Sequence, residues 1–162
     1  MADYLKARDE AKKIWMDWNL TSPPVPIIEI AESFGLTVRD VDFGERQALS
    51  GILDIDNKKI YLNNNDSSTH KRFTVAHELG HWILHKELIR EDPSLTLFYR
   101  KPIRGEEDNR EKEANCFAAN ILVPLQQLAL YANKYSDFEL ARFFAVSKEV
   151  IGYRRLLLRG NE

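Results

Sequence analysis

The chain has 162 residues, of which 44% are hydrophobic and 30% are charged, and its formal net charge is −2. This composition is typical of a globular domain and excludes an intrinsically disordered chain, while the small net charge gives no field that would mark a nucleic-acid or membrane binder. A single cysteine, Cys116, excludes an internal disulfide. Residues 1–13 lack the apolar core of a secretory signal, and no apolar run is long enough to span a membrane. We therefore expect a cytoplasmic protein.

The first third of the chain predicts two helices and then a small sheet. Apolar residues at helical spacing indicate a helix over 3–18, and a second helix is expected between Pro26 and Gly35. The period then changes, which predicts strands over 36–41, 51–54 and 59–62. The last two strands flank a polar turn and should form a hairpin. We expect a three-stranded antiparallel sheet.

The rest of the chain is predicted to be helical. A polar loop over 63–68 supplies an N-cap for a helix from about Thr69 to His85, and a further helix runs from about Glu106 to Leu122. The fold class is therefore α+β. We divide the chain into a core, residues 1–124, and a helical subdomain, residues 125–162.

The C-terminal subdomain has the pattern of a helix-turn-helix. Apolar residues over 138–151 fall where such units place their core, and Ser147 would cap the second helix. The segment carries only a small excess of basic residues, whereas DNA recognition needs a basic, polar helix. We therefore favour a structural unit or a platform for a protein partner over a DNA-binding unit.

One cluster of residues carries recognisable chemistry. All four histidines fall within the sixteen residues from His70 to His85, and His77, Glu78 and His81 form an HExxH motif. Residues four apart lie on one face of a helix, so the two imidazoles of the motif can bind one zinc ion. The intervening Glu78 would then lie beside a metal-bound water and act as the general base.

A zinc site needs at least a third protein ligand. His70 and His85 lie about 10 and 12 Å from His77 along a straight helix, too far to share one ion with it. We therefore predict that both are surface residues.

The remaining source is a glutamate from the second long helix. Glu113 precedes Phe117 by four residues and should point toward the apolar face, where a carboxylate needs a partner. Glu111 is its main competitor. We predict one Zn²⁺ per chain held by His77, His81 and Glu113, although these ligand types would also accept Mn, Co or Fe.

Two blocks of sequence resemble the ImmA/IrrE family of metallopeptidases. They are residues 70–81 (HKRFTVAHELGH) and 113–124 (EANCFAANILVP), and residues 49–52 are also similar. The resemblance implies a minimal gluzincin-like core in which His77, His81 and Glu113 bind zinc and Glu78 is the general base. It also implies a protein substrate, commonly a helix-turn-helix repressor encoded nearby in a phage or mobile element. Residue 123 departs from the family pattern, since valine stands where a longer apolar residue is usual.

These observations predict a zinc-dependent endopeptidase. Tyr99 and His70 are the candidates for stabilising the oxyanion, the strand over 59–62 would present an edge to an extended substrate near Tyr61 and Asn63, and residues 88–100 form a surface loop or a lid. The alternative is a transcriptional regulator that uses the metal core as a scaffold and binds a repressor or DNA without cutting. A purely structural zinc site would not need Glu78.

Overall fold

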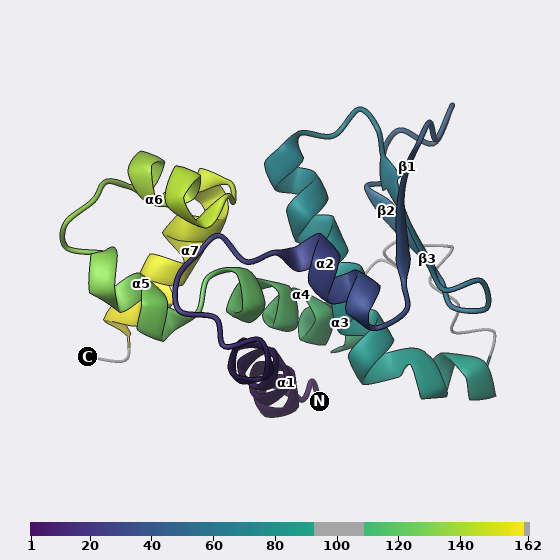
Figure 1. Ribbon diagram of the computed structural model, residues 1–162, viewed down its shortest axis with the longest axis horizontal. Coiled ribbons are helices and arrows are strands. Elements are labelled where there is room, and N and C mark those ends of the chain that lie inside the picture. The colour runs from purple at the N-terminus through teal and green to yellow at the C-terminus, as the bar shows by residue number, and fades with distance from the viewer. Residues whose placement is uncertain (93–108, 161–162) are drawn as a thin grey trace.

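The computed structural model describes residues 1–92 and 109–160, and Figure 1 shows their arrangement. The described residues form seven helices and one three-stranded sheet, which confirms the α+β class. The elements are, in chain order, α1 (Tyr4–Asp17), α2 (Ile27–Ser33), β1 (Thr37–Val41), β2 (Gly51–Asp54), β3 (Lys59–Asn63), α3 (Ser68–Glu91), α4 (Asn109–Leu122), α5 (Leu125–Tyr131), α6 (Asp137–Phe144) and α7 (Lys148–Arg159).

The sheet is mixed, with the order β1-β3-β2. Strands β2 and β3 form the expected antiparallel hairpin, but β1 pairs with β3 in parallel, which corrects the fully antiparallel prediction. The connection over 42–50 is long enough to carry the chain past the place that β3 later fills, and the hairpin then brings β3 back beside β1. Strand β3 is therefore central, and the prediction that it offers a free edge is wrong.

Asn63, at the end of β3, holds the connection between β1 and β2. The residue is 1% exposed, and its side-chain amide donates to the backbone oxygens of Leu49 (3.0 Å) and Gln47 (3.3 Å). A buried amide needs such partners. Asn63 thus fixes the start of β2.

Helix α3 runs through the middle of the molecule. The side chain of Ser67 accepts a hydrogen bond from the backbone N–H of His70, so the predicted N-cap is confirmed. The helix continues to Glu91, beyond the predicted end, because Leu84 and Ile89 still find buried positions. Its buried side chains meet α4 on one side and β2 and β3 on another.

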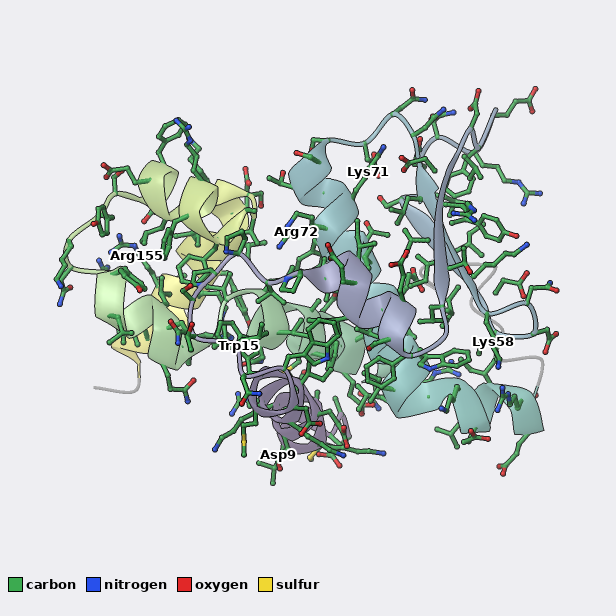
Figure 2. The ribbon with its side chains drawn as sticks, viewed as in Figure 1. Asp9, Trp15, Lys58, Lys71, Arg72 and Arg155 are labelled. Atoms are coloured by element: carbon green, nitrogen blue, oxygen red, sulfur yellow. The ribbon has the colours of Figure 1, made fainter. Side chains whose placement is uncertain are left out.

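Helix α1 covers the side of α4 that α3 leaves open (Figure 1). The indole of Trp15, which Figure 2 shows on the inner face of α1, is 9% exposed and donates from Nε1 to the backbone oxygen of Ile121 at 2.8 Å. Buried tryptophans keep their N–H satisfied in this way. Helix α4, which carries the predicted glutamate ligand, is therefore held between two helices.

The C-terminal helices are joined to the core by two arginines. Arg154 of α7 is 2% exposed and donates to the backbone oxygen of Val123 (2.8 Å) and to Asn120 Oδ1 (2.9 Å). Arg72 of α3, labelled in Figure 2, donates to the backbone oxygens of Val25 (2.7 Å) and Ala145 (3.1 Å). The division at residue 124 stays a prediction. None of the helices over 1–92 and 109–160 is long and apolar enough to cross a membrane.

Candidate metal centre

The HExxH motif lies in the buried middle of α3. His81 and Glu78 are 0% exposed and His77 is 6% exposed. The two histidines are one helical turn apart, so their rings are neighbours on the helix and meet edge to face with centroids separated by 4.7 Å. Their Nε2 atoms face each other at 3.0 Å.

Helix α4 brings a carboxylate to this pair. The Oε1 atom of Glu111 lies 3.0 Å from His81 Nε2, and its Oε2 atom lies 3.3 Å from His77 Nε2. Ligand atoms of these three residues all fall within 4.8 Å of one another. In the part of the chain that the structure describes, this is the one group of three or more metal-binding side chains so arranged.

The structure differs from the prediction that Glu113 is the third ligand. The Oε2 atom of Glu113 lies 2.8 Å from His85 Nε2, and its Oε1 atom accepts a hydrogen bond from the backbone N–H of Asp3 at 2.7 Å. The reason is helical geometry. Residues 111 and 115 are one turn apart and share the face of α4 that is directed at the motif, whereas residue 113 is about 200° further round the helix and points away from that face. In the structure it is therefore the carboxylate of Glu111, and not that of Glu113, that meets His77 and His81.

His85 is also placed differently from the prediction. It is 2% exposed, not on the surface, and its Nδ1 atom lies 3.0 Å from His81 Nδ1. His85 contacts the Nδ1 side of the His81 ring, whereas His77 contacts its Nε2 side, so His85 is kept apart from His77 as expected. The i, i+4, i+8 spacing of His77, His81 and His85 was the signal that all three lie on one buried face.

A second residue that sequence reasoning missed is Asn115. Its Oδ1 atom lies 2.8 Å from His77 Nδ1. An amide oxygen only accepts hydrogen bonds, so His77 Nδ1 carries the proton and the neutral ring presents a lone pair at Nε2. Asn115 lies one turn after Glu111, on the same face of α4.

The hydrogen-bond pattern indicates that the cluster is suited to a cation. Burial lowers the pKa of His81 to about 4, with a hydrogen bond to Glu111 acting in the opposite direction. At neutral pH the ring is therefore uncharged, and imidazole nitrogens face a carboxylate that can only accept. Two imidazoles and one carboxylate form a donor set that zinc uses in catalytic sites, where water takes the fourth position. The residues present fit a zinc ion.

Two glycines let the elements of the site approach. A Cβ at Gly80 would lie 3.0 Å from Phe117 Cδ1 and 3.3 Å from Ala114 Cα, so the close crossing of α3 and α4 (Figure 1) depends on the missing side chain. A Cβ at Gly51 would collide with Thr74 Cγ2 and would lie 3.6 Å from Glu78 Oε1. The Glu78 carboxylate therefore lies against the start of β2.

Of the two candidates for stabilising an oxyanion, the structure describes only His70, and it does not bring His70 to the metal ligands. His70 is in the first turn of α3, with a half-exposed side chain whose Nε2 lies 2.8 Å from Ser50 Oγ. It is about 10 Å along the helix from His77. Tyr99, and the part of the predicted loop or lid over 93–100, lie outside the described residues.

Comparisons with known proteins relate the chain to a family of metallopeptidases. Residues 31–155 match the family model Peptidase_M78, the IrrE N-terminal-like domain. The metallopeptidase ImmA of Bacillus subtilis (strain 168) is 29% identical over 93 residues, which is 56% of this chain and 52% of that protein. A solved structure of a Mycobacterium tuberculosis transcriptional regulator has the same fold, with a TM-score of 0.68 and 19% identity over 92% of this chain and 46% of the other.

The chain spans about half the length of each of these two proteins. The family model, in contrast, covers most of this chain, including both motif blocks and the three clustered side chains on α3 and α4. The protein belongs to the ImmA/IrrE family of metallopeptidases.

Proposed function

We propose that this protein is a zinc-dependent endopeptidase that cuts a peptide bond in a protein substrate. The observation that carries the proposal is the buried carboxylate of Glu78 in the same turn of α3 as His77 and His81, which meet Glu111 of α4. A site that only stabilised the fold would gain nothing from a second buried carboxylate beside its ligands. We assign the ligand set to His77, His81 and Glu111.

In this mechanism Glu78 moves the proton. A zinc ion bound to the three ligands would polarise the scissile carbonyl and lower the pKa of a bound water. Glu78 takes one proton from the attacking water as its oxygen bonds to the carbonyl carbon. As the C–N bond breaks, Glu78 delivers that proton to the leaving amine nitrogen. Burial keeps bulk water away from the carboxylate, which strengthens its interaction with the reacting groups.

The edge of the sheet next to Glu78 suits an extended substrate. Among the described residues, β2 pairs only with β3, and its first residue, Gly51, lies beside the Glu78 carboxylate. A peptide that added to β2 by backbone hydrogen bonds would pass in front of Glu78. This assigns to β2 the edge role that the sequence had suggested for β3.

The proposed substrate class is a helix-turn-helix repressor. The support is the resemblance of residues 70–81 and 113–124 to the ImmA/IrrE family, together with the relative named a metallopeptidase. We propose that the protein acts in the cytoplasm, where such a repressor is found, and that the C-terminal helices contribute to holding it.

Co-expression with the helix-turn-helix protein encoded beside the gene tests this proposal. Wild type and Glu78→Gln are compared by intact-mass spectrometry, and zinc content is measured for both. We expect one defined cut in the wild-type sample, and loss of at least about 100-fold in cleavage rate for Glu78→Gln with zinc retained. Equal cleavage by the two proteins would remove Glu78 from the mechanism.

A non-cleaving regulator is the competing proposal. It is favoured by the name of the structural neighbour, a transcriptional regulator, although 19% identity supports the shared fold alone. In this case the zinc-loaded protein would leave the repressor intact and bind it or duplex DNA. A DNA affinity that falls steeply as salt is raised would support the DNA-binding form of this alternative.

A further inference from the structure

A line of hydrogen bonds leads away from the back of the His81 ring. His81 Nδ1 lies 3.0 Å from His85 Nδ1, and His85 Nε2 lies 2.8 Å from Glu113 Oε2. The other oxygen of that carboxylate accepts the backbone N–H of Asp3 at 2.7 Å. The line therefore begins at the proposed ligand His81, crosses to α4 and ends at the start of α1.

The direction of each bond follows from the chemistry of its acceptor. An ionised carboxylate only accepts, so His85 Nε2 carries a proton and donates it to Glu113. A neutral imidazole with a proton on Nε2 has a lone pair on Nδ1, and this lone pair must accept from His81 Nδ1. When a cation occupies the site, His81 Nε2, which lies 3.0 Å from Glu111 Oε1, needs no proton to meet that carboxylate, and the lone pair of His81 is left on Nε2.

Burial makes this arrangement hard to replace. The side chains of His81 and His85 are 0% and 2% exposed, and that of Glu113 is 16% exposed. Water has little access to act as a substitute partner for either ring. If His85 could not accept, the His81 proton would be free to move to Nε2, where it would block metal binding.

We propose that His85 and Glu113 are a positioning pair, which holds His81 in the one tautomer that can bind the metal. The pair rests on the proposed metal site but not on the proposed cleavage reaction. It also gives Glu113 a role distinct from that of a ligand, and it parallels the contact of Asn115 with His77. Both proposed histidine ligands thus have their Nδ1 atoms fixed by the protein.

The backbone of Asp3 completes the pair from a distant part of the sequence. Asp3 is the N-cap of α1, and its own side chain accepts from the backbone N–H of Lys6. With one oxygen of Glu113 held by Asp3, the carboxylate has its other oxygen fixed toward His85. The packing of α1 against α4 therefore sets the orientation of the Glu113 carboxylate, which reaches the proposed ligand His81 only through His85.

The test uses the full chain and compares His85→Leu with His85→Asn. The two replacements have similar size, but the asparagine amide oxygen stands near the place of the imidazole Nδ1 and can accept from His81. We expect His85→Leu to raise the zinc Kd about 10- to 100-fold, the range seen when such outer partners are removed. His85→Asn should recover part of this loss, and Glu113→Gln should fall between wild type and His85→Leu.

Three readouts separate positioning from other roles. The zinc Kd is measured by chelator competition. The tautomer of His81 is determined by ¹⁵N NMR of the ring nitrogens. The Tm is measured on the metal-free proteins. If the pair had only a structural role, both His85 substitutions would lower the Tm of the metal-free protein, and the two variants would have the same zinc Kd. That result would overturn the proposal. ¹⁵N NMR of the zinc-loaded wild type that placed the His85 proton on Nδ1 instead of Nε2 would overturn it as well.

The absorption spectrum of the Co²⁺-loaded proteins distinguishes a ligand from a positioning residue. Glu111→Gln should change the visible bands because the coordination changes, whereas Glu113→Gln should keep their pattern and only weaken binding. If wild type bound no zinc or cobalt, the metal site and with it the proposed function would fail. If wild type bound zinc and the His85 and Glu113 variants bound it equally well, only the positioning pair would fail.

Discussion

At the scale of single residues, Gly80 controls how closely the two helices of the site approach. A Cβ at this position would lie 3.0 Å from Phe117 Cδ1 and 3.3 Å from the Ala114 backbone. Contacts of this length require Phe117 or the α4 backbone to give by a few tenths of an ångström, and because Ala114 Cα belongs to the backbone we expect α4 itself to move outward. Because α4 carries Glu111, the same movement would draw that carboxylate away from His77 and His81.

We therefore predict that Gly80→Ala destabilises the protein despite the better helix propensity of alanine. The expected loss in the free energy of unfolding is about 1–3 kcal/mol from overpacking, set against about 1 kcal/mol of gain in propensity. Zinc affinity should fall as well. Urea unfolding of the metal-free protein and chelator competition measure the two effects.

Gly152 in α7 is the matched control. A Cβ built there meets no other atom within 4 Å, so Gly152→Ala should stabilise the protein by about 0.5–1 kcal/mol and leave zinc affinity unchanged. If both alanines stabilised the protein equally, the close packing at Gly80 would not limit the approach of the helices.

Part of the site could be read from residue spacing. The HExxH motif placed His77, Glu78 and His81 on one buried helix face because four-residue spacing fixes that geometry. The choice between Glu111 and Glu113 could not be made in this way. The two residues are about 200° apart around α4, so the choice depends on which side of that helix faces α3, and spacing within one helix does not contain that information.

At the scale of elements, α6 begins with a reciprocal cap. Ser136 Oγ accepts from the backbone N–H of Glu139, and the Glu139 carboxylate accepts from the backbone N–H of Ser136 at 2.8 Å. This capping box satisfies two backbone donors that the first turn leaves open. It lowers the pKa of Glu139, first through the backbone hydrogen bond from Ser136 and then through the serine hydroxyl.

The lowered pKa predicts a pH-dependent contribution to stability. Because the folded state favours the ionised carboxylate, the contribution is present above the ordinary carboxyl pKa and is lost as pH falls through the lowered value. Glu139→Gln should therefore be less stable than wild type at neutral pH, and the difference should shrink in acid. Urea unfolding of both proteins from pH 7 to pH 3 with EDTA present measures it. A difference that stayed constant over this range would show that the charge of Glu139 does not contribute.

The sequence predicted the helices and strands themselves better than it predicted which strands pair with one another. The hairpin of β2 and β3 follows from a local turn, and it was confirmed. The pairing of β1 with β3 is parallel and depends on where a long connection crosses the sheet. No local sequence pattern predicts the path of that connection. The end of α3 was placed too early, because its last turns are kept helical by burial of Leu84 and Ile89 rather than by a capping signal.

At the scale of the whole molecule, the boundary at residue 124 separates helices that the structure joins through buried polar contacts. Burial lowers the pKa of Arg154 to about 10, so the guanidinium is still charged at neutral pH and requires its two acceptors on α4 and the turn that follows. Arg72 makes a similar link from α3 to the turn before α7. The predicted boundary follows from Pro124, which ends a helix. Composition and periodicity do not indicate which side chains form contacts across that point.

These links predict that the C-terminal helices unfold together with the core. In native-state hydrogen exchange, the slowest amides of α7 and α4 should open with the same free energy in wild type. Arg154→Leu leaves the buried oxygen of Val123 without its donor, at a cost of about 1–3 kcal/mol, and should let α7 open before α4. Arg159→Leu, an exposed change in the same helix, is the control and should keep the two openings equal. If α7 already exchanged well before α4 in wild type, residues 125–162 would be an independent unit. The fold would then hold the metal centre without help from the C-terminal helices.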